Sequence, residues 1–340
     1  MEMTTIGLDL AKDVLQVHGV DATGEVVLRK RLRRAQVLPF FAAQPPCLVG
    51  MEACTTAHYW AREIAALGHE VRLIPAQYAK AYVKRGKNDA ADAEAICEAV
   101  GRPSMRFVPV KTVGQQAGLV LHRVRDLLIR QRTMLINALR CHLAEFGIIA
   151  PQGPQNVGRL LAVLVGDEAD YRLPPLARDV LRLLAEQLAS LGARIRAVET
   201  RMRVWFRSDA TCRRLATIPG IGPIVATALV AAIGDPGVFE SGRNFAAWLG
   251  LTPRQNSTGG KARLGGITKR GDAYLRRLLL SGAQAVLRWS KGARSDPWLT
   301  ALSARKPPMV VTVALANKMA RIVWAVWTRS TEFRRPALAA

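Results

Sequence analysis

The sequence predicts an α/β domain in residues 1–110, an antiparallel helical or coiled-coil segment in 111–207, and a mainly helical domain in 208–330 with a tail, 331–340. Three observations support this division. Short apolar runs alternate with helical patterns in the first part, and two long amphipathic patterns fill the second. In the third part, glycine-rich turns separate apolar helical stretches. The 340 residues, half of them hydrophobic, are enough for two or three domains with cores.

The first domain begins with a pattern typical of an antiparallel hairpin. Apolar strands are predicted at 6–10, 14–20 and 25–32, with a turn at 21–24. Another apolar run, 47–51, precedes a predicted helix at 57–67, and a further strand is predicted at 70–74. Because strands alternate with helices, we expect an α/β sheet that carries its chemistry at the strand ends.

Four acidic residues occupy positions where such a sheet would bring them together. Asp9 closes the run 6–8, Glu52 closes the run 47–51, and Asp89 and Asp92 lie three residues apart in a predicted helix start. Residues three apart share one helix face. A ribonuclease-H-like sheet would gather all four around Mg²⁺ or Mn²⁺, which take oxygen ligands. Taken singly, each could be an ordinary surface acid.

The charge of the chain indicates a polyanionic partner. The net charge is +23 and the pI is near 10.9, and residues 1–110, 111–207 and 208–340 carry +2, +7 and +14 in order. Nucleic acid is the leading partner, because basic side chains that neutralise phosphates release counterions. An anionic membrane is the weaker alternative, since no lipidation motif or basic amphipathic anchor is found.

Other classes receive little support. The N-terminus lacks a signal-peptide pattern, and the longest nearly apolar run noted, 223–234, is too short for a bilayer, so we expect a cytoplasmic protein without membrane contact. The five cysteines form no CxxC pair, so neither a disulfide framework nor a zinc site is indicated. No GxxxxGK[ST] motif occurs, so no nucleotide cofactor is expected.

Two helical patterns define the middle of the chain. Apolar residues, among them Val124 and Leu128, recur at helical spacing across 113–146, and a second helix is predicted at 175–206 after a Gly- and Pro-containing loop, 151–174. The pair is either an assembly element or an ordinary hairpin between domains. Four tryptophans in later apolar stretches are expected in the core: Trp289, Trp298, Trp324 and Trp327.

Two features of the chain could contact phosphates. The run 29–34 has five basic residues on a predicted strand, which is either a solvated edge or a nucleic-acid contact. The turn 219–223, Pro-Gly-Ile-Gly-Pro, is typical of a helix-hairpin-helix. There Gly220 and Gly222 would expose backbone N–H groups to a phosphate. A turn built only for helix packing is the alternative.

Ser257 lies in a Gly-rich stretch among cations. Five basic side chains surround it in the sequence: Arg254, Lys261, Arg263, Lys269 and Arg270. Nearby positive charge would stabilise both a serine alkoxide and the charge that develops on an attacked phosphodiester. Most serines in such stretches only form turns.

Two sets of motifs carry a family resemblance that covers most of the chain. The sequences IGLD at 6–9, GMEA at 50–53 and KNDAADA at 87–93 resemble the RuvC-like half of the DEDD transposases of the IS110 and IS1111 insertion-sequence family. The stretches IPGIG at 218–222, GLTPRQNSTGGK at 250–261 and GGITKRGDAYLR at 265–276 resemble the C-terminal transposase domain of the same family.

The resemblance implies a site-specific DNA recombinase that mobilises its own element. Such enzymes are described as guided by a structured bridge RNA that pairs with donor and target DNA. Asp9, Glu52, Asp89 and Asp92 take the metal positions and Ser257 the nucleophile position, with Thr258 as the alternative nucleophile. Family members are described as tetramers, dimers of dimers whose active sites combine acids of one subunit with the serine of another. A bacterial protein that associates with the nucleoid when active is implied.

Two other classes of function fit the same residues. One is a RuvC-like structure-specific endonuclease that hydrolyses DNA and uses Ser257 only as a turn residue. The other is a nucleic-acid-binding scaffold without catalysis. A covalent protein–DNA adduct would distinguish the recombinase from the first, and metal-dependent cleavage would exclude the second.

Overall fold

The computed structural model describes residues 2–83, 88–165, 172–289 and 296–334. Lys87 of the KNDAADA motif and residues 335–340 of the expected tail lie outside these ranges. The chain forms two compact units, Met1–Val113 and Gly114–Ala340. The first is a mixed α/β unit and the second is almost entirely helical.

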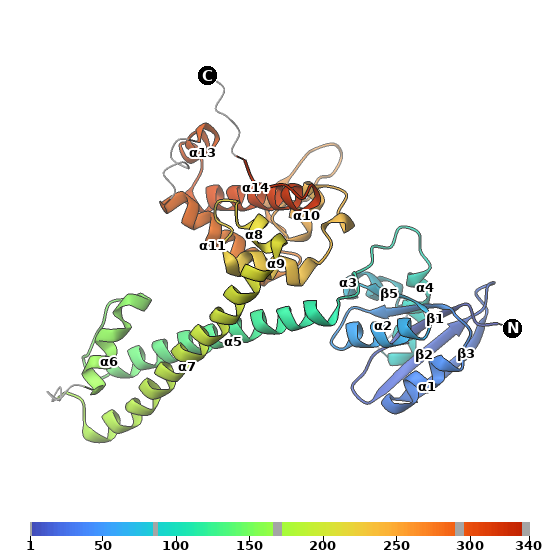
Figure 1. Ribbon diagram of the computed structural model, residues 1–340, viewed down its shortest axis with the longest axis horizontal. Helices are drawn as coiled ribbons and strands as arrows, with labels where there is room; N and C mark the ends of the chain where they lie inside the picture. The colour runs from blue at the N-terminus through green and yellow to red at the C-terminus, as the bar shows by residue number, and fades with distance from the viewer. Residues whose placement is uncertain (1, 84–87, 166–171, 290–295, 335–340) are drawn as a thin grey trace. The chain divides into compact units, whose positions relative to one another are not determined.

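A five-stranded sheet forms the centre of the first unit (Figure 1). The strand order is β3-β2-β1-β4-β5; β1, β2 and β3 pair antiparallel, whereas β4 pairs parallel to β1 and to β5. All strands expected from the sequence are confirmed within two residues at each end. Their bounds are Thr5–Asp9 (β1), Val14–Val20 (β2), Val26–Arg33 (β3), Leu48–Glu52 (β4) and Glu70–Ile74 (β5).

The two faces of the sheet are covered differently. The side chains of Ile6, Leu8 and Val49 pack with helices α1 and α2 in one buried core. On the other face, α4 lies against β1, β2 and β4. The alternation of side chains along a strand therefore places Asp9 and Glu52 on the α4 face. The helices are Val37–Ala42 (α1), Ala57–Ala66 (α2), Ala76–Ala79 (α3) and Asp89–Val100 (α4).

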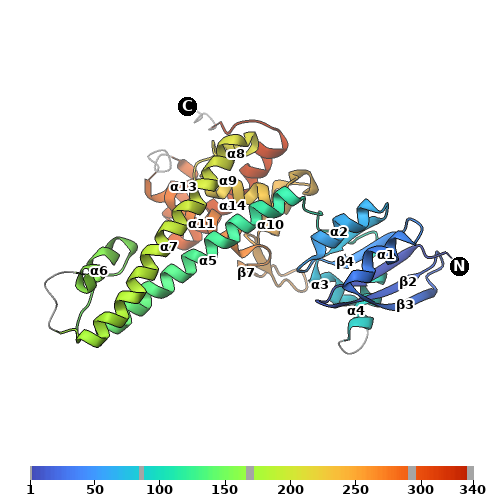
Figure 2. The same cartoon turned by 60° about the horizontal axis from the view of Figure 1, so that its bottom comes forward.

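Two long helices, α5 (Val113–Ala144) and α7 (Pro175–Ser208), begin the second unit and confirm the expected pair. In both views they lie close together over part of their length and diverge toward the start of α5 and the end of α7 (Figures 1 and 2). Leu128 of α5 packs with Leu191 and Ile195 of α7, and Arg125 pairs with Glu199 at 2.7 Å, so the helices are antiparallel.

The segment between the long helices differs from the expected loop. Residues 151–174 contain the helix α6 (Val157–Val165). Leu160 and Leu164 are buried against the leucines of α5 and α7. The start of this segment is typical of a loop because it contains Pro151, Gly153 and Pro154. The short apolar helix that follows was therefore not predicted.

The rest of the second unit packs around one large core. Its helices are Ala210–Leu215 (α8), Pro223–Ile233 (α9), Gly242–Trp248 (α10), Ala273–Trp289 (α11), Pro297–Ser303 (α13) and Pro308–Thr328 (α14). A two-stranded hairpin, Pro253–Gln255 (β6) and Leu264–Ile267 (β7), was not expected from the sequence.

The expectation of a core position is corrected for two of the four tryptophans. Trp289 is 82% exposed and Trp298 39% exposed, so neither is a core residue, although Trp327 is buried. Among the described residues, one helix, α14, is long and apolar enough that by length and composition alone it could cross a membrane. Its buried face packs in the core of the second unit.

Candidate active site

Three of the four expected acids converge. Asp9 ends β1, while Asp89 and Asp92 lie in the first turn of α4, where the Asn88 side chain caps the helix by accepting from the Ala91 N–H at 2.7 Å. One carboxylate oxygen from each acid lies within 4.8 Å of the others, and we call these three residues the acid cluster. Asp9 and Asp92 are half-buried and Asp89 is exposed.

Glu52 lies next to the acid cluster but outside that distance. It ends β4, which pairs with β1, and Leu8 of β1 is opposite Met51. Glu52 is therefore on the adjacent strand end, on the same face as Asp9. The negative charge of Glu52 interacts with Asp9, because it is one of the causes that raise the pKa of Asp9. All four acids thus lie near the C-terminal ends of β1 and β4, and three of them are close enough together to bind one metal ion.

Burial and the neighbouring acids disfavour the charged form of Asp9. Burial raises the pKa of Asp9 to about 6, and the negative charges of Asp92, Asp89 and Glu52 add to the effect. The N-terminus of α4 offsets part of this repulsion for Asp89 and Asp92, because a helix N-terminus carries partial positive charge. A bound divalent cation would favour the charged forms of all of these carboxylates.

Ser257 lies in the loop between β6 and β7, and we call residues 253–267 the serine hairpin. Its side chain is exposed. The Ser257 Oγ accepts hydrogen bonds from Gln255 Nε2 and from the Arg263 N–H, each at 3.2 Å. At the tip, Gly259 and Gly260 both have positive φ, as a two-residue hairpin turn requires. The neighbouring Thr258 is bridged to Lys261.

The cations expected around Ser257 belong to this hairpin and the segment after it. All five are exposed: Arg254, Lys261, Arg263, Lys269 and Arg270. None of them forms an ion pair with a described residue. The hairpin therefore presents unneutralised positive charge beside the serine hydroxyl.

The base of the serine hairpin is held together tightly. A Cβ on Gly250 would lie 2.0 Å from the Arg270 carbonyl oxygen, and one on Gly271 would lie 1.9 Å from that of Trp248. Arg276 of α11 donates from Nη1 to the carbonyls of Leu249 and Arg270, at 3.0 and 3.1 Å. The two ends of the hairpin segment are thus joined by close backbone packing and one guanidinium.

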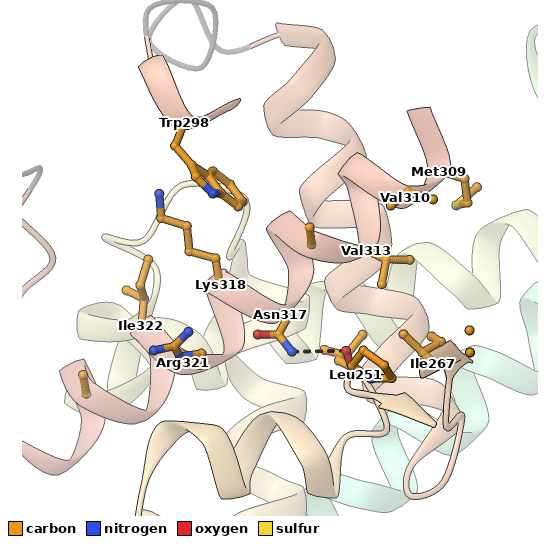
Figure 3. A pocket seen from close by; sticks show the side chains of 15 residues that line it. Leu251, Ile267, Trp298, Met309, Val310, Val313, Asn317, Lys318, Arg321 and Ile322 are labelled. Atoms are coloured by element: carbon orange, nitrogen blue, oxygen red, sulfur yellow. Dashed lines mark hydrogen bonds between the residues drawn. The ribbon is translucent and has the colours of Figure 1, made fainter. Parts of the chain in front are cut away.

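A cavity of about 1000 Å³ lies beside the hairpin, against α13 and α14. Leu251 and Ile267 line it from the hairpin side (Figure 3). Asn317 of α14 donates from Nδ2 to the Leu251 carbonyl at 3.1 Å, as the dashed line marks. The contact attaches the hairpin base to the core helix α14.

The turn that contains Gly220 and Gly222 joins α8 to α9. Gly220 has φ +86°, and a Cβ there would lie 2.8 Å from the Gly282 carbonyl of α11. Gly222 precedes α9 with open space around its Cβ position. Gly220 therefore has a packing role, whereas Gly222 leaves the start of α9 accessible.

A buried polar network was missed from the sequence. His122 of α5 is 2% exposed; its Nδ1 lies 3.0 Å from the Tyr274 hydroxyl and its Nε2 3.1 Å from Thr227 Oγ1. Burial, with a smaller contribution from Arg125, lowers the pKa of His122 to about 4. The network joins α5, α9 and α11. A lone histidine in an amphipathic helix gives no sequence signal for it.

Comparison with known proteins agrees with the motifs. A family model described as "Transposase" matches residues 6–148, and one described as "Transposase IS116/IS110/IS902 family" matches residues 212–297. A "Probable family 20 transposase" of Pseudomonas aeruginosa is 53% identical over 98% of this chain and 99% of that protein.

Two further relatives are transposases of named elements. The "Transposase for insertion sequence element IS1328" of Yersinia enterocolitica is 44% identical over 98% of this chain and 99% of its own length. The "Transposase for insertion sequence element IS1111A" of Coxiella burnetii is 39% identical over 98% of this chain and 92% of its own length. The chain is therefore a transposase. It belongs to the IS116/IS110/IS902 family.

Proposed function

We propose that this transposase is an RNA-guided, site-specific recombinase that cleaves and rejoins DNA through a covalent serine intermediate. The acid cluster binds a divalent metal, and Ser257 is the nucleophile. The observation that carries the proposal is the convergence of Asp9, Asp89 and Asp92 within 4.8 Å in a chain whose second unit presents an exposed serine among cations.

The donor set fits magnesium or manganese. Asp9, Asp89 and Asp92 offer carboxylate oxygens, and Glu52 is a fourth donor on the adjacent strand end. Burial and, after it, the charges of the neighbouring acids raise the pKa of Asp9, and a bound cation would offset both effects. When bound, the metal would neutralise phosphate oxygens and favour phosphoryl transfer. The strand order β3-β2-β1-β4-β5, with acids on β1, β4 and α4, supports a RuvC-like assignment for this unit.

The serine performs an exchange of phosphodiester bonds. The Ser257 oxygen attacks a DNA phosphorus, so that a Ser257 O–P bond forms and a P–O bond of the DNA breaks. The serine proton passes to solvent, and the departing DNA oxygen takes up a proton to become a hydroxyl. A hydroxyl end of another strand then displaces the serine and restores it. One bond replaces another at each step, so no nucleoside triphosphate is needed.

The exposed cations of the serine hairpin stabilise the charge that develops on the attacked phosphate. Arg254, Lys261 and Arg263 belong to the serine hairpin, and Lys269 and Arg270 follow β7. The helix pair α8–α9 with its glycine turn acts as a helix-hairpin-helix, in which Gly222 and the start of α9 contact a DNA backbone. Such contacts give affinity without reading the base sequence.

Sequence specificity comes from a structured bridge RNA. This part of the proposal rests on the family resemblance and on the basic charge, since the predicted parts 111–207 and 208–330 carry almost all of the excess. We expect RNA and DNA binding that weakens steeply with salt. Recombination that proceeds equally well without the RNA would contradict guidance. Since its substrate is DNA, we expect the enzyme to work on the bacterial nucleoid.

The long helical pair supports a homo-oligomer, and we propose a tetramer. Exposed apolar residues recur at spacings of four, three and seven along α5: Val120, Val124, Leu127 and Met134. The helix α7 adds Leu176, Val180 and Leu183. An exposed apolar stripe at helical spacing is typical of a coiled-coil contact, and a second copy of this chain is the occupant we propose.

A hydrolytic RuvC-like endonuclease is the second candidate. The acid cluster favours it as much as the recombinase, because a metal-bound site can also activate water. The two functions differ in their products: hydrolysis leaves free phosphate and hydroxyl ends, whereas the recombinase leaves a protein–DNA adduct that survives denaturation. A non-catalytic scaffold is less well supported, since it gives the converging acids no role. Metal-dependent strand cleavage by the purified chain, lost in Asp9→Asn, would exclude it.

A further inference from the structure

The edge strand β3 carries arginines in register with the acid cluster. Asp9 of β1 is opposite Gln16 of β2, and Gln16 is opposite Arg31 of β3. Opposed residues of neighbouring strands point to the same face. Arg31 is therefore on the acid-bearing face, and its α-carbon is two strand spacings, about 10 Å, from that of Asp9.

Arg29 extends this row along the same face. It is opposite His18, which is opposite Gly7, the residue directly beneath α4. Arg29 and Arg31 are both exposed, and we call them the arginine row. Lys30, between them, points to the other face, where its Nζ lies 5.5 Å from the centre of the Phe40 ring.

A small hollow joins the arginine row to the acid-bearing helix. Its volume is about 180 Å³, and its lining includes Gln16, Arg29, Arg31 and Ala90; Lys30, whose side chain points to the other face, also borders it. Ala90 follows Asp89 in the first turn of α4. A chain of phosphates that leaves the acid cluster across β2, toward β3, would thus meet the two guanidinium groups.

Two simpler roles explain the arginine row less well. If it neutralised the acids, the arginines would pair with them, yet neither Arg29 nor Arg31 forms an ion pair with any described residue. Charges on an edge strand also prevent strands of different molecules from pairing. Prevention of strand pairing does not depend on the face of the sheet to which a charged side chain points, so Lys30 would serve it equally well. It therefore does not explain why Arg31 is in register with Asp9.

We propose that Arg29 and Arg31 bind the phosphodiester backbone of the DNA strand on which the acid cluster acts, next to the phosphate that is cut. The inference rests on the proposed function, because the acid cluster determines which strand passes there. Guanidinium groups suit this task, since each can donate two hydrogen bonds to one phosphate. The strand is DNA rather than guide RNA, because the reacting strand continues from the acid cluster.

The test uses the full-length protein with its RNA and a labelled donor DNA, with Ca²⁺ in place of Mg²⁺ to suppress cleavage. The photo-crosslinking residue p-benzoylphenylalanine is placed at position 31 or, as the matched control, at position 30. We expect DNA crosslinks from position 31 at nucleotides next to the cleavage site, and at least tenfold fewer from position 30. Crosslinks to RNA alone, or equal DNA crosslinks from both positions, would overturn the inference.

A second measurement needs no crosslinker. Affinity for DNA is measured across a salt series for Arg29→Gln/Arg31→Gln, for Arg31→Lys and for the control Lys30→Gln. Each lost phosphate contact should reduce the slope of log affinity against log salt by about 0.7–0.9. Arg31→Lys should keep the slope and Lys30→Gln should match the wild type. Equal slopes in all four proteins would contradict the inference.

The same samples separate this inference from the proposed function. Strand transfer is then measured with Mg²⁺. If position 31 crosslinks to DNA but neither the wild type nor any variant forms a serine adduct, the proposed chemistry fails and the DNA-binding role of the arginine row stands. If adducts form normally in Arg29→Gln/Arg31→Gln with an unchanged KM for DNA, the row fails and the chemistry stands.

Discussion

Gly7 of β1 lies directly against the backbone of Ala93 in α4: a Cβ added to Gly7 would be 2.1 Å from the Ala93 carbonyl oxygen. Only glycine allows this approach. Because Asp9 follows two residues after Gly7 and Asp92 precedes Ala93, the contact brings these carboxylates together. A backbone contact in the middle of the sheet thus sets the geometry of the acid cluster.

We predict that Gly7→Ala destabilises the first unit and disrupts the acid cluster. The new methyl group meets backbone, which cannot rotate away, so the cost should reach the upper end of the usual 1–3 kcal/mol for overpacking, roughly 3 kcal/mol. Chemical denaturation and Mn²⁺ titration measure the two effects. Gly101→Ala is the control, since a Cβ at Gly101 meets nothing within 4 Å. An unchanged Mn²⁺ affinity in Gly7→Ala would contradict this account.

Replacing an acid by its amide should remove metal binding and leave the fold intact. A metal at a hundred times its Kd stabilises a protein by about 2.7 kcal/mol, and we expect Mg²⁺ or Mn²⁺ to raise the Tm of the wild type accordingly. Asp9→Asn, Glu52→Gln and Asp92→Asn should lose this response and all recombination. Glu25 is an exposed acid next to the turn between β2 and β3, at the end of these strands that is remote from Asp9. Glu25→Gln should therefore behave as wild type. Full activity in any of the three would remove that residue from the site.

The raised pKa of Asp9 gives this metal response a pH dependence. Its usual pKa is 3.8 and its folded value is about 6, so a proton competes with the metal below about pH 6. Metal affinity should fall as the pH is lowered from 7 to 5. In the metal-free protein the sign is opposite: protonated Asp9 favours the fold, and that contribution is lost as the pH rises from 3.8 to about 6. Metal titrations at several pH values measure the first effect, and affinity independent of pH would refute it.

His122 should make the second unit sensitive to acid. Its usual pKa of 6.5 falls to about 4 in the fold, so between these values the unfolded chain binds more protons. The free energy of unfolding should therefore decrease as the pH falls from 6.5 to 4. His122→Gln should cost about 1–3 kcal/mol at pH 7, through its lost hydrogen bonds, and should flatten this pH dependence. Denaturation curves from pH 4 to 7 give the free energy of unfolding of both proteins. The same pH dependence in the wild type and in His122→Gln would contradict the account of a buried neutral histidine.

The apolar stripe on α5 predicts how the oligomer can be broken. Val124→Asp and Leu127→Asp place charges in the stripe, and we expect smaller assemblies at micromolar protein, because burying an unpaired carboxylate in a helical contact is costly. Sedimentation velocity measures the assembly state. Thr133→Asp, exposed on α5 at none of the stripe's spacings, is the matched control and should leave assembly unchanged. A wild-type oligomer in both stripe variants would show that the contact lies elsewhere.

The sequence predicts the parts of the fold whose patterns are local and strong. The strands of the sheet follow from apolar runs, and α5 and α7 from long helical periodicity. Asp9 and Glu52 were found because each ends an apolar run, and Asp89 and Asp92 because they share one helical turn. The tight approach of α4 at Gly7 could not be predicted, since it depends on which strand neighbours which.

Other features depend on register or on weak patterns. Arg31 and Lys30 are adjacent and alike in sequence, and only the strand pairing places Arg31 in line with Asp9. The serine hairpin was missed because its strands are short and exposed, and glycines interrupt the apolar pattern. The helical spacing along α5 does not separate its buried positions, such as Leu128, from its exposed ones, such as Val124.

The central claim, that Ser257 forms a covalent link to DNA with the help of a metal-binding acid cluster, is tested most directly by isolating that link. The protein is incubated with its RNA, Mg²⁺ and a donor DNA that is nicked near the junction, so that strand exchange cannot be completed. After denaturation and proteolysis, the adduct is mapped by mass spectrometry. We predict a nucleotide on Ser257, absent in Ser257→Ala and in Asp9→Asn and retained in Thr258→Ala. Cleaved DNA with free ends and no adduct, or an adduct on Thr258 alone, would contradict the account.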